Sequence, residues 1–234
     1  MNRIVLFDID GTLLTMGDAA KVAFADALTR AAGRPIDPDG YSFSGKTDPQ
    51  IARDILALHG VTGRELEAAI PETIRLYVEA IGGDWKRLAD ARLLPGVNAL
   101  LEALHARGDA CVALLTGNVE GGARVKVGHF DLTRYFDFSI SCFGSDDADR
   151  YRLPALALQR ARRRFDEEMT GEHLVVVGDS EHDVLCARTV GARTVAVGTG
   201  WTTESRLRAL RPDVFLDDLS DTGRAVAAIL DPER

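Results

Sequence analysis

Five short runs of apolar residues restrict the fold of this chain more than any other feature. The runs contain no charged residue, and apolar and polar side chains do not alternate along them. Such runs are typical of parallel strands that are buried on both faces of a sheet. We therefore predict strands at Ile4–Phe7, Cys111–Leu115, Leu174–Val177, Thr194–Val197 and Val214–Leu216.

Helical periodicity fills the segments between the later runs. A chain that alternates strand and helix in this way predicts an α/β fold, a doubly wound, Rossmann-like parallel sheet. The predicted helices of this part are Val97–Ala106, Val119–Phe130, Pro154–Phe165 and Val184–Val190.

About a hundred residues separate the first run from the second, whereas one crossover between parallel strands needs roughly a dozen. An inserted α-helical domain accounts for the excess, and the turn at Leu94 to Val97 leads back to the core. We predict a core of residues 1–14 and 91–234 and an inserted domain of residues 15–90. The helices predicted within the insertion are Lys21–Ala32, Pro49–His59, Gly63–Ala80 and Trp85–Ala89.

Charge and cysteine content limit the partners and the compartment. The 36 acidic residues outnumber the 28 basic ones, which gives a formal net charge of −8 and disfavours general attraction to nucleic acid or to an anionic membrane. No apolar run approaches the ~18 residues of a membrane span, and the three cysteines are widely spaced. We expect a cytoplasmic protein with reduced thiols, and its oligomeric state stays open.

The first apolar run ends in two carboxylates one residue apart, Asp8 and Asp10. In open α/β sheets, ligands bind at the carboxyl edge of the strands. Two like charges are costly to bury there unless a cation compensates them. The pair therefore indicates a functional site rather than an ordinary turn.

Two further runs end in groups that suit such a site. Asp179 and Asp183 follow the third run four residues apart, so that both can face one crevice at the start of a helix, although helix capping explains part of this pattern. The second run ends in Thr116, Gly117 and Asn118, which offer a hydroxyl, close backbone approach and free helix N–H groups to an anion.

Together the three strand ends resemble the haloacid dehalogenase-like hydrolase superfamily, whose motifs are D-x-D-G-T, a Thr or Ser after the second strand, and G-D-x-x-x-D. The likeness covers essentially the whole chain and favours a phosphoglycolate phosphatase-like member. It implies a phosphoric monoester hydrolase in which Asp8 attacks phosphorus and Asp10 is the general acid and base. Thr116 and the N–H groups of Gly117 and Asn118 would bind the transferring phosphoryl group.

The resemblance also implies a Mg²⁺ site. The carboxylates of Asp8 and Asp179 and the backbone carbonyl of Asp10 would be its protein ligands, because Mg²⁺ prefers few oxygen ligands together with water and phosphate. Asp183 would support these ligands from outside the coordination shell. The substrate would be a small phosphate ester, such as a phosphoglycolate-like acid or a sugar phosphate.

The inserted helices resemble the α-helical cap that this family places after its first motif. A cap closes over the site and selects the substrate. Lys46 lies in a segment that is similar to the cap loop facing the site, so it could reach a substrate anion. Asp48 followed by Pro49 is also a good helix start, so capping alone explains half of this segment.

The third family motif is different here, because the usual K-P-x-P segment is replaced by residues 149–154, which contain no Lys. A cation is still required beside Asp8, and Arg150 or Arg152 must supply it. We favour Arg150, since some members of the family carry Arg at the equivalent place. A surface ion pair at the start of a helix is the other explanation for this Arg.

Other activities on the same fold remain open. A phosphomutase would return the phosphoryl group to its substrate, whereas a haloacid dehalogenase has no use for Asp10 or for Mg²⁺. A phosphonate hydrolase would need a cap Lys that forms an imine, and a non-catalytic binding protein usually lacks one of the acidic residues. We expect His182 on the solvent face of its loop, and Trp85 and Trp201 in packing.

Overall fold

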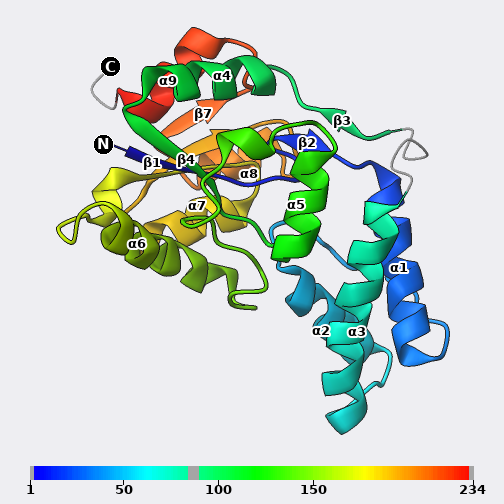
Figure 1. Ribbon diagram of the computed structural model, residues 1–234. Coiled ribbons are helices and arrows are strands. Elements are labelled where there is room, and N and C mark those ends of the chain that lie inside the picture. The colour runs from blue at the N-terminus through cyan, green and yellow to red at the C-terminus, as the bar shows by residue number, and fades with distance from the viewer. Residues whose placement is uncertain (1–2, 84–89, 232–234) are drawn as a thin grey trace.

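The computed structural model describes residues 3–83 and 90–231. At its centre lies a sheet of five parallel strands in the order β4-β1-β5-β6-β7 (Figure 1). The strands are β1 (Arg3–Phe7), β4 (Ala110–Leu114), β5 (Leu174–Gly178), β6 (Arg193–Val197) and β7 (Val214–Leu216). All five predicted strands and the α/β class are confirmed. Because β4 and β5 lie on opposite sides of β1, the carboxyl ends of these three strands surround a topological switch point, where such sheets bind ligands.

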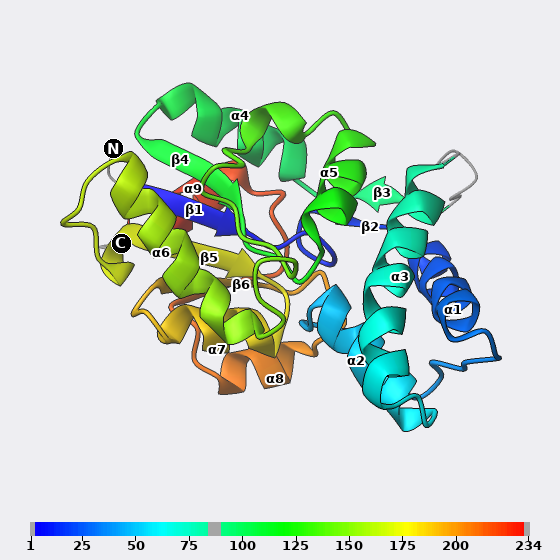
Figure 2. The ribbon, with the colours of Figure 1, turned by 60° about the horizontal axis from the view of Figure 1, so that its bottom comes forward.

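Both faces of the sheet are covered by helices, as Figure 2 shows. Val5 and Phe7 of β1 pack in one apolar cluster with α4 and α9, whereas Ile4 and Leu6 pack in a second cluster with α6 and α7. This double burial explains why the strand sequences do not alternate. The helices are α4 (Val97–Arg107), α6 (Leu153–Arg164), α7 (Glu181–Arg188) and α9 (Thr222–Leu230).

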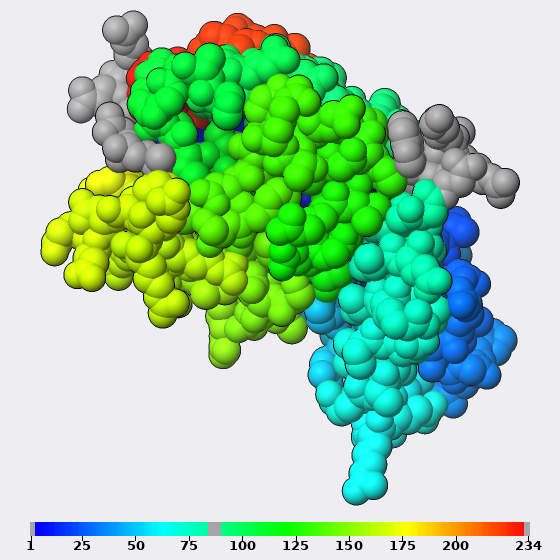
Figure 3. Space-filling view, viewed as in Figure 1, coloured from blue at the N-terminus to red at the C-terminus, as the bar shows by residue number. Residues whose placement is uncertain are grey.

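Most of the long segment between β1 and β4 forms a lobe of its own, blue to cyan in Figure 3, which projects from the rest of the molecule. Its helices are α1 (Asp18–Ala32), α2 (Asp48–Leu58) and α3 (Gly63–Gly82). They share an apolar cluster of their own, which includes Phe24, Leu28, Ile55 and Tyr77. This separate cluster supports our proposed division into a core of residues 1–14 and 91–234 and a cap of residues 15–90.

Two short elements join the cap to the core. β2 (Leu14–Thr15) and β3 (Arg92–Leu93) pair antiparallel, so the chain leaves and re-enters the core through adjacent strands. The core helix α5 (Glu120–Gly128) lies next to α3 of the cap, as both ribbon views show. The cap is therefore held against the carboxyl edge of the sheet.

The predicted helices that fall within the described residues are all present, with ends shifted by at most three residues. The predicted helix Trp85–Ala89 lies outside the described residues. The sequence analysis missed β2, β3, α8 (Glu204–Ala209) and α9. Over the described ranges, 3–83 and 90–231, no helix is both long and apolar enough to cross a membrane.

Candidate active site

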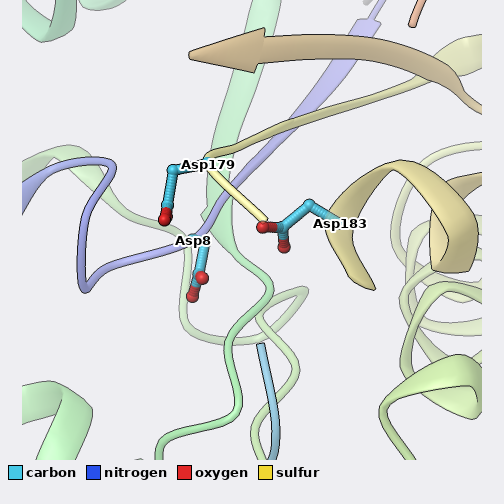
Figure 4. Close-up of side chains that lie close together, drawn as sticks. All are labelled: Asp8, Asp179 and Asp183. Carbon is cyan, nitrogen blue, oxygen red and sulfur yellow. The ribbon is translucent and has the colours of Figure 1, made fainter. Parts of the chain in front are cut away.

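Three buried carboxylates meet at the carboxyl edge of the sheet. Asp8 follows β1, Asp179 follows β5, and Asp183 lies in the first turn of α7. Carboxylate oxygens of the three residues lie within 4.8 Å of one another, and Figure 4 shows the segments from which they come. The structure thus brings together three acidic residues that the sequence analysis had singled out.

Local hydrogen bonds fix two of these side chains. Asp8 Oδ1 accepts a hydrogen bond from the N–H of Ile9 at 2.8 Å. Asp183 Oδ2 accepts from the backbone N–H of Ser180 at 2.9 Å and from its hydroxyl at 2.6 Å. The N–H of Asp183 in turn donates to the Ser180 hydroxyl oxygen at 3.3 Å, which completes a capping box at the start of α7. Asp183 therefore caps the helix and also faces the acidic cluster.

Three buried carboxylates so close together are electrostatically unfavourable when all of them are ionised. Burial raises the pKa of Asp8 to about 6, against the lowering effect of Arg150. Burial and the charges of Asp183 and Asp8 raise the pKa of Asp179 well above its ordinary range, although Asp179 accepts a hydrogen bond from the Thr12 hydroxyl at 3.0 Å. Closely spaced carboxylate oxygens with uncompensated charge fit a hard divalent cation such as Mg²⁺.

Arg150 is the cation inside the cluster. One of its terminal nitrogens lies 3.0 Å from Asp8 Oδ2 and also pairs with Asp183, and its side chain is 3% exposed. Its Nε is buried and has no hydrogen-bond partner in the part of the chain that is described. Arg152 is 73% exposed and lies 3.5 Å from Asp147. Of the two candidate cations, the structure places Arg150 beside Asp8.

Asp10 is held by a second buried cation that the sequence analysis missed. Asp10 Oδ2 accepts hydrogen bonds from the Asn118 side-chain amide at 2.8 Å and from Lys126 Nζ at 2.6 Å. The Lys126 side chain is 3% exposed. A sequence signal for it existed, because Lys126 lies with Ala123 and Val127 on the buried face of α5, and a lone Lys on an apolar helix face needs a partner.

The loop after β4 presents groups that suit an anion. The buried Thr116 hydroxyl accepts from the backbone N–H of Asn118 at 3.3 Å and from its side-chain amide at 2.9 Å. A hydrogen bond between Thr116 and Asp8 acts to lower the pKa of Asp8, against the effect of burial. The N–H of Gly117 donates to no protein acceptor in the described residues. The three predicted residues therefore lie together next to Asp8.

Gly117 also allows the cap to approach the core. A Cβ atom at this position would lie 2.0 Å from the carbonyl oxygen of Lys46, a contact that no side chain tolerates. The N–H of Asp48 donates to the Gly117 carbonyl at 2.8 Å, and Asp48 Oδ2 accepts from the N–H of Val119 at 2.9 Å. The capping explanation for Asp48 is wrong, because Thr47 is the N-cap of α2 and its hydroxyl accepts from the N–H of Gln50 at 3.2 Å. The Asp48 carboxylate binds the core instead.

A cavity of about 470 Å³ separates the carboxylates from the cap. The cap wall mixes polar and apolar side chains, and its apolar and aromatic members include Phe24, Tyr41, Phe43, Ile51 and Tyr77. Lys46 also lines it, and its Nζ lies 3.8 Å from the centre of the Tyr41 ring. Within the described residues Lys46 forms no ion pair, whereas Lys21 of the same wall pairs with Asp39 at 3.1 Å.

Comparison with known proteins identifies the family. The model of the haloacid dehalogenase-like hydrolase family matches residues 5–197. The chain belongs to the haloacid dehalogenase-like hydrolases. The match includes the three residues of the acidic cluster as well as Asp10, Lys126 and Arg150.

Individual relatives of this hydrolase carry phosphatase names. A 5′-nucleotidase of Pseudomonas aeruginosa is 30% identical over 219 residues, which cover 92% of this chain and 91% of that protein. Phosphoglycolate phosphatase 1 of the same species is 30% identical over 230 residues, which cover 94% and 78%. The crystal structure of a predicted phosphoglycolate phosphatase from Haemophilus somnus superposes with a TM-score of 0.72 over 97% of this chain and 98% of that one, at 21% identity. That likeness shows a shared fold.

Two expectations about side chains of this hydrolase were wrong. His182 is half-buried, with its ring Nδ1 3.1 Å from the Tyr151 hydroxyl. Gly45 of the cap packs on it, because Gly45 has a φ of +69° and a Cβ there would lie 2.4 Å from the His182 ring. Trp201 is 67% exposed at the rim of the cavity rather than packed. Trp85 lies outside the described residues.

We expect the buried carboxylate of Asp48 to make the stability of the hydrolase depend on pH. Burial raises the pKa of Asp48 from 3.8 to about 6, against the charge of Lys126 and the hydrogen bond from Val119. A folded-state pKa above the unfolded value means that the folded state binds the proton more tightly, so stability falls as pH rises from about 4 to 6.

We expect Asp48→Asn, which retains an acceptor, to remove this dependence. Between pH 4.5 and 7.5 the unfolding free energy of the variant should rise by roughly 2 kcal/mol relative to wild type. Chemical denaturation of both proteins at the two pH values measures the difference. A difference that does not change with pH would mean that Asp48 is not protonated more readily in the folded state.

Proposed function

We propose that this hydrolase is a Mg²⁺-dependent phosphatase that cleaves a small phosphorylated metabolite through an aspartyl-phosphate on Asp8. The observation that carries the proposal is the position of the Asp8 carboxylate, which lines the cavity between cap and core and lies 3.0 Å from the guanidinium of Arg150. A carboxylate can attack a phosphate dianion only where cations reduce the repulsion between the two.

The acidic cluster would hold the metal. Asp8 and Asp179 would contribute carboxylate oxygens and Asp10 its backbone carbonyl, while Asp183 supports the site by pairing with Arg150. Mg²⁺ bound there would offset the negative charge of the carboxylates and of the phosphate, as hard cations do in phosphoryl transfer. The raised pKa of Asp179 supports this proposal, because burial and neighbouring carboxylates leave its charge uncompensated by the protein.

The residues of the chain divide the reaction between them. Asp8 forms a bond to phosphorus while the bond to the leaving oxygen breaks, and Asp10 gives that oxygen its proton. In the second half, Asp10 takes a proton from water, which attacks the phosphorus and releases Asp8. The Thr116 hydroxyl and the N–H groups of Gly117 and Asn118 would bind the phosphoryl oxygens, together with Arg150.

The size and the lining of the cavity limit which group the substrate can carry beside its phosphate. A volume of about 470 Å³ suits a small metabolite, since binding pockets for small molecules span roughly 300–1,000 Å³. Lys46 is proposed as the contact for a second anionic or polar group, because no carboxylate within the described residues pairs with it. We favour a phosphoglycolate-like acid or a sugar phosphate. Because one relative is named a 5′-nucleotidase, nucleoside monophosphates belong among the substrates to be tested.

Release of inorganic phosphate tests the proposal. The purified chain should hydrolyse p-nitrophenyl phosphate and at least one member of a panel of phosphorylated metabolites when Mg²⁺ is present. EDTA should abolish turnover, and excess Mg²⁺ should restore it. A phosphomutase would convert a sugar phosphate without net phosphate release. No turnover on any ester of the panel would contradict the phosphatase assignment.

A further inference from the structure

Lys126 and Asn118 bind the same oxygen of Asp10. Both donors reach Oδ2, at 2.6 Å and 2.8 Å. An ammonium group and an amide N–H₂ are donors only, so Oδ2 cannot carry a proton while it faces both of them. Oδ1 accepts no hydrogen bond from the described residues, and Asp10 lines the cavity.

The burial of Lys126 restricts the Asp10 side chain to one orientation. The side chain of Lys126 is 3% exposed, whereas that of Asp10 is 28% exposed. A buried ammonium that loses its partner is strongly destabilising, so Lys126 holds Asp10 in the rotamer that keeps Oδ2 beside it. Burial lowers the pKa of Lys126, but Asp10, Tyr77 and Asp48 together raise it above its ordinary value, so the group stays charged.

The partners of Lys126 belong to both domains. Its Nζ lies 5.9 Å from the centre of the Tyr77 ring on α3 of the cap. Asp48, also of the cap, contributes a nearby negative charge and is bonded to the backbone at Val119, just before α5 begins. The cation that orients Asp10 is therefore enclosed by residues of both domains.

We propose that Lys126 is the positioning residue that, together with Asn118, fixes Oδ2 of Asp10 and so makes Oδ1 the atom that transfers the proton. The inference rests on the proposed function and deepens it. In the first step the Oδ1–H bond breaks and the leaving oxygen takes the proton, which leaves Asp10 as a carboxylate. In the second step Oδ1 takes a proton from the attacking water, and Asp10 is restored.

Leaving-group dependence tests this role, because a basic leaving oxygen needs the proton more than a weakly basic one. Lys126→Met should lower kcat/KM by roughly 100-fold for phenyl phosphate and by less than roughly tenfold for p-nitrophenyl phosphate. These two esters differ little in size, and kcat/KM reports the step in which the leaving group departs. Arg124→Met, an exposed cation of the same helix, is the control and should change neither value by more than about twofold.

A double-mutant cycle keeps the inference falsifiable if Lys126→Met folds poorly. In an Asp10→Asn background, which has no carboxylate left to orient, Lys126→Met should cause no further loss with p-nitrophenyl phosphate. Equal losses with both esters, or additive losses in the double variant, would overturn the inference while leaving the phosphatase intact. Wild-type protein that cleaves neither ester would overturn the proposed function and this inference with it.

Discussion

Asp8→Asn is expected to lower turnover by at least about 10⁴-fold. An amide is a poor nucleophile and a poor metal ligand, so the variant loses the attacking group and one ligand of the proposed Mg²⁺ site at once. The assay is phosphate release from p-nitrophenyl phosphate under saturating Mg²⁺. A thermal melt is the folding control, since Asn has the shape of Asp and Arg150 keeps its pair with Asp183. Substantial residual turnover would place the nucleophile elsewhere.

Arg150→Ala is expected to cost both stability and phosphate binding. It leaves the buried carboxylates of Asp8 and Asp183 without their shared cation, and breaking a buried pair in this way costs about 3–5 kcal/mol of unfolding free energy. Inhibition by inorganic phosphate should also weaken in this variant, because Arg150 is a proposed ligand of the phosphoryl group. Chemical denaturation and phosphate inhibition measure the two effects.

Arg152→Ala is the matched control for this prediction. Its side chain is 73% exposed and pairs loosely with Asp147 and Asp149, so its loss should change stability by no more than about 0.5 kcal/mol. Arg150→Lys restores the charge without the planar guanidinium and should recover part of both losses. A larger loss of phosphate affinity in Arg152→Ala than in Arg150→Ala would contradict the assignment of Arg150.

Some parts of the site could be predicted from sequence because the order of the strands alone determines their positions. Asp8, Thr116 and Asp179 follow β1, β4 and β5, and the carboxyl ends of parallel neighbours meet at one edge whatever the details of packing. The position of the Arg150 side chain could not be predicted from strand order, because it depends on how the turn before α6 packs against Asp183. Only the structure separates it from Arg152.

The parts that escaped prediction depend on contacts between segments distant in sequence. Lys126 lies in the last turn of α5, and its partner Asp10 is 116 residues away. The orientation of His182 depends on the close approach of Gly45 from the cap. β2 and β3 have two residues each, too few for any periodicity to be visible.

The central claim, a phosphoryl group carried on Asp8, can be measured directly. The wild-type chain is quenched in acid during turnover, treated with borohydride, which reduces an acyl phosphate to an alcohol, and digested for mass spectrometry. We predict reduction at residue 8 in the wild type and no reduced carboxylate in Asp8→Asn. Reduction at a different carboxylate, or none while phosphate is being released, would contradict the account.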